Sequence, residues 1–492
     1  MHLKNVGRWE RWATILMVLM LIGGEAFAKD RSIYNASALN ALAHIEKLPR
    51  SGEGTIDVYY DFVENGKLSG GKVAIEAPST APELFLTAPS YNAYTLIDNG
   101  PSENRIDLVC VGDGYTAAEM DLYLAHVANI LELFFNEEPL KEYASYFNVH
   151  VVEVISNQSG VDEPGLGIYR DTALDMAFDC QGIDRLLCVN YTKAWTAAEN
   201  ARDTDLVLAF ANTTRYGGAG YPKLSTLAGG NDAAVEVALH EFGHSFANLA
   251  DEYHYYDGTT YVGSEPTESN VSKSNAAAQL ASHLKWYRWL DLPEVDTFEG
   301  AKYKQYGIYR PTDISKMMAL GFPFEPVNVE QFVFNIYQVV SSIDSSTPAA
   351  YGVLPGAGVF SVMCQVPATH TLRVEWQIDG TTVLNSNQTS FCPDIYLTAN
   401  TIHILKARVI DGTALVRDEN KRITLLTDEK SWQVCRASAD FNTDGIVDIA
   451  DLTDMSLWWL SDNGNYDVAP LGGNGIVNFE DFAVLAEQWQ SN

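Results

Sequence analysis

Residues 238–253, "ALHEFGHSFANLADEY", place two histidines four positions apart, with a glutamate directly after the first. Apolar residues around this stretch recur at helical spacing, namely Val235, Leu239, Phe242, Phe246 and Leu249. This pattern predicts a helix with one buried face, and Asn231 or Asp232 is the predicted N-cap. At about 100° per residue, His240 and His244 lie together outside the apolar stripe, so both imidazoles are expected to point into a cleft.

The two histidines and the glutamate together predict a zinc peptidase site. Two imidazoles on consecutive helical turns can bind one zinc ion, which lowers the pKa of water to about 7. Glu241 lies on the flank of the histidine face, where its carboxylate can accept the proton of the activated water and pass it to the leaving amine. A chance match on a surface helix is the alternative, expected in about one of a hundred such chains.

The third zinc ligand is predicted from the acidic pair that follows. Asp251 has the same azimuth as the histidines, but on a continued helix it would lie ~10 Å further along the axis. The chain must therefore turn back after His244, and Asn248 is of the non-glycine type that best tolerates a left-handed helix end. Asp251 is the predicted ligand, with Glu252 and His254 as alternatives. The plain interpretation of the acidic pair is a solvated helix end.

Composition excludes some classes of partner. The chain has 492 residues, enough for several domains, and 64 acidic against 32 basic residues give a formal net charge of −32. This charge repels nucleic acid and anionic lipid, and it suits calcium, which takes oxygen ligands. We therefore expect no nucleic-acid partner.

The N-terminus has the pattern of an export signal. Lys4, Arg8 and Arg11 precede an apolar run over 13–22, and an Ala-Phe-Ala sequence ends at position 28. The run is about half of the ~20 residues that a spanning helix needs, so an uncleaved anchor is the weaker alternative. We expect a signal peptide over 1–28, a secreted or cell-surface-associated protein, and no membrane span after cleavage.

Export permits disulfides between the six cysteines. Spacing suits two local pairs, Cys180 with Cys188 and Cys364 with Cys392. Buried free thiols are an equally compatible alternative.

The predicted fold class is multidomain α+β. Strand-like alternation over about 51–77, with a hairpin turn at Asn65-Gly66, predicts an N-terminal β domain over 29–99. Three strands and one long helix are predicted next, at 106–116, 147–156, 204–212 and 117–137. They indicate a mixed α/β sheet that carries the motif helix in a peptidase domain over 100–345.

Two further modules are predicted toward the C-terminus. Short strands separated by Gly, Asp and Asn turns predict an immunoglobulin-like β-sandwich over 346–435. The last part, 436–492, is duplicated, because a shift of thirty positions superimposes 445–459 on 475–489.

The first copy of this repeat matches an EF-hand-type calcium loop, "DFNTDGIVDIAD", at 440–451. The predicted calcium ligands are Asp440, Asn442, Asp444, the carbonyl of Ile446, Asp448 and Asp451. In the second copy Pro470 and Gly472 stand where the first two ligands belong, which leaves Asn474, Asn478 and Asp481. We expect one good calcium site and one weak or absent site, and a metal-free turn is the alternative for each.

Four stretches together resemble the IgA-peptidase-type metallopeptidase family, from about Asn104 to Tyr337. They are "NRIDLVCVGDGYTAAEM", "YFNVHVVEVISNQSGVD", "RYGGAGYPKLSTLAGG" and "HEFGHSFANLADEY". The resemblance implies a zincin-like, metzincin-like fold with zinc ligands at the two histidines, a glutamate base, and a Met-turn at Met317 or Met318. Ala247 departs from the family pattern, which has glycine there. Nothing in the sequence supports the IgA specificity that names the family.

The C-terminal repeat resembles a dockerin, which implies a helical calcium module that binds a cohesin-like receptor. The leading hypothesis is thus a secreted zinc metalloendopeptidase that acts on protein or peptide substrates and is tethered by a calcium-dependent docking module. The alternative is a non-catalytic adhesion or scaffold protein with a degenerate zincin domain. Tyr216, Tyr221 and Tyr253 are candidate donors to the developing oxyanion, although packed aromatics are commoner.

Overall fold

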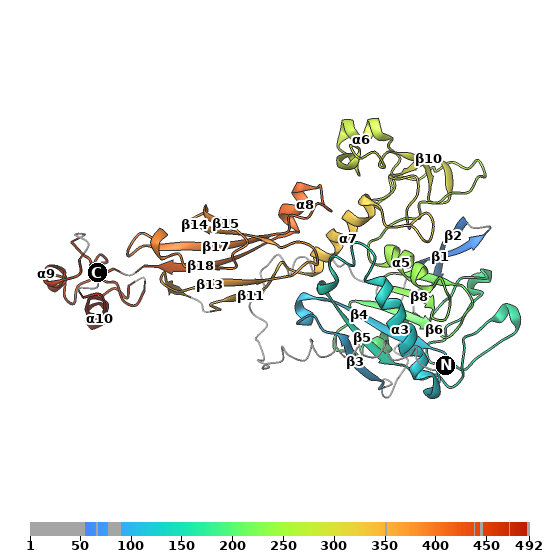
Figure 1. Ribbon diagram of the computed structural model, residues 1–492, viewed down its shortest axis with the longest axis horizontal. Helices are drawn as coiled ribbons and strands as arrows, with labels where there is room; N and C mark the ends of the chain where they lie inside the picture. The colour runs from blue at the N-terminus through green and yellow to red at the C-terminus, as the bar shows by residue number, and fades with distance from the viewer. Residues whose placement is uncertain are drawn as a thin grey trace, which may run out of the picture. The chain divides into compact units, whose positions relative to one another are not determined.

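The computed structural model describes residues 55–64, 67–76, 90–349, 352–436, 438–442, 446–471 and 473–489. They form a multidomain α+β protein with several sheets (Figure 1). Residues 1–54, which include the predicted signal peptide, lie outside the described residues. In the part that is described, no helix is long and apolar enough to span a membrane.

The largest sheet has eight strands in the order β2-β1-β7-β8-β6-β4-β5-β3. The strands are β1 (Thr55–Glu64), β2 (Lys67–Glu76), β3 (Asn92–Ile97), β4 (Ile106–Asp113), β5 (Phe147–Glu153), β6 (Leu206–Ala211), β7 (Gly218–Tyr221) and β8 (Leu224–Ala228). Strands β4, β5, β6 and β8 pair in parallel, and the outer pairs are antiparallel. Every residue of β4 and β6 is buried, as is typical of parallel strands covered on both faces.

Helices cover both faces of this sheet. They are α3 (Met120–Phe134), α4 (Tyr191–Ala198), α5 (Ala234–Ser245) and α7 (Pro326–Val339). The core on one face joins α3, α5 and α7, where the rings of Phe134 and Phe332 both pack against Phe242. The other core includes Ala194 and Ala197 of α4. The strands and the helix predicted between 106 and 212 are confirmed, and Figure 1 shows α3 and α5 lying along the sheet.

The N-terminal strands lie at the edges of the same sheet. The predicted hairpin is confirmed, because β1 and β2 pair with Glu64 opposite Lys67. Strand β1 also pairs with β7, with Tyr59 opposite Gly220, and β3 pairs with β5. Among the described residues these strands form no separate sheet. They pair instead with β7 and β5, whose backbone groups would otherwise be unpaired at the edges of the sheet. These strands therefore join the sheet that carries α5, and the N-terminal β domain over 29–99 stays a prediction.

After α5 the chain forms α6 (Ala276–Ser282) and a two-stranded sheet of β9 (Phe298–Ala301) and β10 (Lys304–Arg310). A three-stranded and a five-stranded sheet follow α7. The three-stranded sheet consists of β11 (Ile343–Thr347), β13 (Phe360–Cys364) and β16 (Ser390–Phe391). The five-stranded sheet consists of β12 (Val353–Pro355), β14 (Arg373–Ile378), β15 (Thr381–Ser386), β17 (Ile402–Ile410) and β18 (Thr427–Cys435). The short helix α8 (Glu419–Thr424) lies between β17 and β18 in the chain. The two sheets share one core around Phe360, Trp376 and Trp432. This packing is typical of a β-sandwich, and the immunoglobulin-like assignment stays a prediction.

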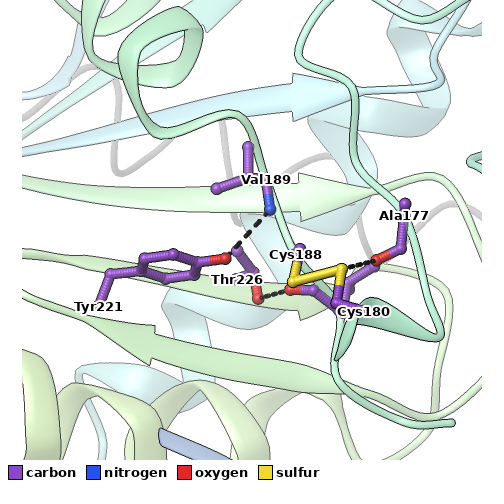
Figure 2. Close-up of a disulfide and its surroundings, with 7 residues drawn as sticks. Ala177, Cys180, Cys188, Val189, Tyr221 and Thr226 are labelled. Atoms are coloured by element: carbon purple, nitrogen blue, oxygen red, sulfur yellow. Dashed lines mark hydrogen bonds between the residues drawn. A yellow bond between two sulfur atoms is a disulfide. The ribbon is translucent and has the colours of Figure 1, made fainter. Parts of the chain in front are cut away.

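The cysteines behave differently in the two predicted pairs. Cys180 and Cys188 form a disulfide, as predicted (Figure 2). Cys364 and Cys392 are free, so that pairing was wrong. In the β13–β16 ladder Phe360 lies opposite Phe391, which places the two cysteines five positions apart along the strands, roughly 17 Å.

Candidate metal centre

Helix α5 ends in the reversal that the third ligand requires. It begins at Ala234, and its N-cap is Ala233 rather than the predicted Asn231 or Asp232. The side chain of Asn231 accepts the N–H of Ala233 in the turn before the helix. At the other end Asn248 has a φ of +50°, the predicted left-handed conformation. Its N–H donates to the carbonyl of His244 at 3.2 Å, which closes the turn. Because the left-handed position is 248, the alanine at 247 needs no glycine-like backbone.

This reversal brings Asp251 back to the two histidines. The Nε2 atoms of His240 and His244 lie 3.2 Å apart, and Asp251 Oδ1 lies 3.3 Å from each. All three side chains are buried. A tetrahedral zinc ion with bonds of about 2.0 Å separates its ligand atoms by about 3.3 Å. The triangle therefore has the dimensions of a zinc site, and the predicted ligand residues are together in the fold.

Neighbouring groups fix the orientation of these side chains. His240 Nδ1 lies 2.9 Å from the carbonyl of Lys316, and His244 Nδ1 lies 2.7 Å from the carbonyl of Leu249. Since a carbonyl can only accept, each Nδ1 carries the proton and each Nε2 presents its lone pair to the centre of the cluster. The hydroxyl of Tyr303 donates to Asp251 Oδ2, which leaves Oδ1 facing the histidines.

A fourth side chain, Asp61 of β1, enters the cluster and was not predicted. Its Oδ2 lies 2.9 Å from His240 Nε2 and 3.8 Å from His244 Nε2. Its Oδ1 accepts a hydrogen bond from the hydroxyl of Tyr253 at 2.6 Å. Within the described residues, one ligand atom from each of these two histidines and from Asp61 and Asp251 lies within 4.8 Å of the others. Aspartate is disfavoured inside strands, which is the only local signal that marked this position.

The charges in this cluster call for a cation. Burial alone would raise the pKa of Asp61, but the charges of His240 and His244 bring it well below the usual range. Burial would lower the pKa of His244, but the charge of Asp251 raises it to about 9. The oxygens Asp61 Oδ2 and Asp251 Oδ1 have no hydrogen-bond partner in the described chain. Two nitrogen and two oxygen donors so arranged suit a buried zinc ion, which would satisfy both carboxylates.

Glu241 lies beside the cluster and is enclosed by the protein. The residue is fully buried, and neither carboxylate oxygen has a hydrogen-bond partner among the described residues. Burial raises its pKa well above the usual value for glutamate. Little space surrounds this carboxylate, because a Cβ at Gly220 of β7 would lie 2.8 Å from Glu241 Oε2.

The alternatives for the third ligand do not reach the histidines. Glu252 is buried and accepts hydrogen bonds from Asn270, Ser315 and Asn328, so its carboxylate is held by other parts of the fold. His254 lies against Gly300 of β9 instead.

Of the two candidate Met-turn residues, Met317 lies beneath α5. It is fully buried, and a Cβ at Gly243 would lie 2.6 Å from its sulfur. Its carbonyl accepts the N–H of Glu252 at 2.8 Å, next to the carbonyl that orients His240. Met318 is only half-buried. The close packing of Gly243 of α5 on Met317 supports Met317, rather than Met318, as the Met-turn residue.

The three tyrosines considered as oxyanion donors differ in their partners. Tyr221 accepts a hydrogen bond from the N–H of Val189 at 3.3 Å, as Figure 2 shows, and Tyr253 donates to Asp61. The hydroxyl of Tyr216 is buried and has no hydrogen-bond partner in the described chain. The charges of Asp61 and Glu241 add to burial in raising its pKa, so this hydroxyl stays protonated near the centre.

The C-terminal repeat forms α9 (Ile449–Ser456) and α10 (Phe479–Gln488). In the first turn of α9, Asp451 accepts the N–H groups of three preceding residues, Phe441, Asn442 and Asp448. In the first turn of α10, Asp481 accepts the N–H groups of Val468, Ala469 and Asn478 in the same way.

This equivalence corrects the register of the second loop, because Asp467 takes the place of Asp440. Asp467 precedes Asp481 by fourteen positions, whereas Asp440 precedes Asp451 by eleven. The alignment by thirty positions missed this longer loop, in which Pro470 is not the first ligand position. The Asp467 carboxylate accepts the N–H groups of residues 474 and 475. Asp444 lies outside the described residues, and the calcium ligands stay predictions.

Comparison with known protein families covers much of this part of the chain. The sequence model of the IgA peptidase M64 family matches residues 94–295, which include α5 and the Asp251 turn. The match supports the peptidase family and a metallopeptidase activity for this part of the chain. No curated protein matches the sequence.

Proposed function

We propose that this chain is a zinc-dependent endopeptidase in which His240, His244 and Asp251 hold the metal and Glu241 is the general base. The observation that carries the proposal is the 3.2–3.3 Å triangle of ligand atoms beside a buried glutamate with no hydrogen-bond partner in the described chain. Few structural roles would bury these charges together without a cation.

Each residue has a definite task in peptide hydrolysis. When bound, zinc supplies Lewis-acid chemistry that lowers the pKa of water to about 7. Glu241 accepts the proton of the attacking water and delivers it to the leaving amine. Ionised Glu241 is favoured next to a divalent cation, which opposes the effect of burial on its pKa. We assign Tyr216 as the donor to the oxyanion, which is supported by its buried hydroxyl having no partner among the described residues.

The remaining parts of the proposal concern location. The N-terminal pattern over 1–28 supports export. The C-terminal repeat supports a calcium-dependent docking module, since its two helices begin with exposed apolar residues at equivalent positions, Ile449 and Phe479, which are 63% and 77% exposed. Leu457 and Leu460 add exposed apolar surface that suits a protein receptor. The same surface favours the second candidate function, a non-catalytic scaffold that acts only through this module.

Comparison of the full chain with a Glu241→Gln variant separates the two functions. We expect both proteins to bind about one zinc ion per chain, and only the wild type to cleave casein and a quenched fluorescent peptide. Glu132→Gln, an exposed change on α3, is the matched control and should cleave at the wild-type rate. Equal inactivity of the wild type and Glu241→Gln, with intact calcium-dependent partner binding, would instead support the scaffold.

A further inference from the structure

The hairpin β1–β2 covers the proposed metal centre. The ring of Tyr59 stacks on the imidazole of His244, with centroids 4.0 Å apart and an interplanar angle of 8°. Two positions further along β1, Asp61 points its Oδ2 at the two histidine Nε2 atoms. The strand lies against β7, with Tyr59 opposite Gly220.

Several contacts fit the hairpin to this place. Gly70 of β2 pairs with Asp61, and a Cβ on Gly70 would lie 2.7 Å from both Asp61 Oδ1 and the hydroxyl of Tyr253. The hydroxyl of Tyr255 accepts the N–H of Gly70 at 3.1 Å and donates to its carbonyl. The aspartate is therefore held by residues just after the metal helix, two and four positions beyond Asp251.

This arrangement conflicts with catalysis in two ways. A catalytic zinc site has three protein ligands and leaves one position for water or substrate, whereas four protein ligands are typical of closed structural sites. In addition, an extended peptide can bind by adding a strand to a sheet edge, and without β1 and β2 that edge would be β7, which contacts α5. Strand β1 occupies both places, because Asp61 would supply a fourth ligand to a metal held here and the strand pairs with β7.

We propose that strands β1 and β2 are a built-in inhibitor, in which Asp61 is a fourth metal ligand that must leave before substrate binds. This inference rests on the proposed peptidase function. Two observations mark Asp61, rather than Asp251, as the ligand that leaves. Asp251 is equidistant from both histidines at 3.3 Å, whereas Asp61 lies at 2.9 and 3.8 Å. Strand β1 also shares a single residue pair with β7, so few backbone hydrogen bonds oppose its release.

The test compares the full-length wild type with Asp61→Asn, which keeps the shape and can still accept the hydrogen bond of Tyr253. Asp57→Asn is the matched control, because Asp57 lies on the same strand, is exposed and pairs with Lys72. Three quantities are measured: the visible absorption of the Co²⁺-loaded protein, zinc affinity by competition with a chelator, and hydrolysis of a fluorescent peptide.

The proposal predicts that Asp61→Asn alone changes the Co²⁺ spectrum. It also weakens zinc binding by about ten-fold. Peptide hydrolysis rises by about ten-fold or more, because the closed hairpin becomes less populated. An unchanged spectrum and affinity would overturn the proposal by showing that Asp61 is no ligand. Loss of zinc without any gain in hydrolysis would overturn it by showing that Asp61 is a permanent ligand.

A second variant keeps the proposal testable if Asp61→Asn does not fold. Tyr255→Phe removes both bonds to Gly70 and leaves all four ligands in place. We expect faster cleavage of the hairpin by chymotrypsin and a higher rate of peptide hydrolysis. A hairpin that is cut faster while hydrolysis stays at the wild-type rate would overturn the inhibitory role. The proposed function itself fails in a different way, if neither wild type nor variants bind zinc or if Glu241→Gln leaves hydrolysis unchanged.

Discussion

Replacement of Tyr303 by phenylalanine should weaken zinc binding without removing a ligand. The Tyr303 hydroxyl is the donor that holds Asp251 Oδ2 while Oδ1 faces the histidines. Burial and the charge of Asp251 raise the pKa of Tyr303 well above its usual value, so this hydroxyl remains a donor at any physiological pH. Without it, a buried carboxylate oxygen loses its partner, at about 1–3 kcal/mol.

The expected effect is a zinc dissociation constant about 10–100-fold higher, the usual effect of losing a hydrogen bond to a metal ligand. Competition with a fluorescent chelator measures it directly on the full chain. Tyr306→Phe is the matched control, because Tyr306 lies nearby on β10 and is 45% exposed. Equal affinities for Tyr303→Phe and the wild type would refute the role assigned to this hydroxyl, and with it the assignment of Asp251 as a ligand.

Three further predictions concern stability. Met317→Ala should lower the free energy of unfolding by about 2–5 kcal/mol in urea, since it opens a cavity beneath the metal helix. A loss no larger than that of Met318→Ala would contradict the packing described for it. Joint replacement of Cys180 and Cys188 by serine should destabilise the protein by about 2–3 kcal/mol, because a local loop is no longer closed; an unchanged melting temperature would argue against the pairing. Burial raises the pKa of Asp205 to about 6, so the stabilising effect of its protonation is full below about pH 4 and is lost as the pH rises through 6. Asp205→Asn should therefore raise the free energy of unfolding by about 1–2 kcal/mol at pH 8 and by little at pH 4. Urea unfolding at both pH values measures this, and an equal increase at the two pH values would contradict the prediction.

The parts of the site that lie close together in sequence could be predicted. Helical periodicity placed His240 and His244 on one face, and the conformational tolerance of asparagine placed the chain reversal at Asn248. These are local effects, set by residues within a few turns of one another. Asp251 followed from them, because the reversal leaves it near the histidines.

The remaining contacts of the site depend on tertiary packing, which the sequence pattern does not contain. Asp61 reaches the cluster only because β1 pairs with the edge of a sheet whose strand order is not sequential. Tyr303 reaches Asp251 through the small sheet of β9 and β10. In the C-terminal repeat, Asp467 was missed because the second loop is longer than the first, so a fixed shift could not align it.

The proposal that the buried cluster of histidines and aspartates holds a catalytic zinc ion predicts bound metal in the purified protein. Elemental analysis of the full-length chain, purified without chelator, tests it most directly, beside a His240→Ala variant that lacks one imidazole. We expect about one zinc ion per chain in the wild type and a large loss of zinc in the variant. A wild-type protein that takes up no stoichiometric zinc, even when zinc is supplied, would show that this cluster is not a zinc site.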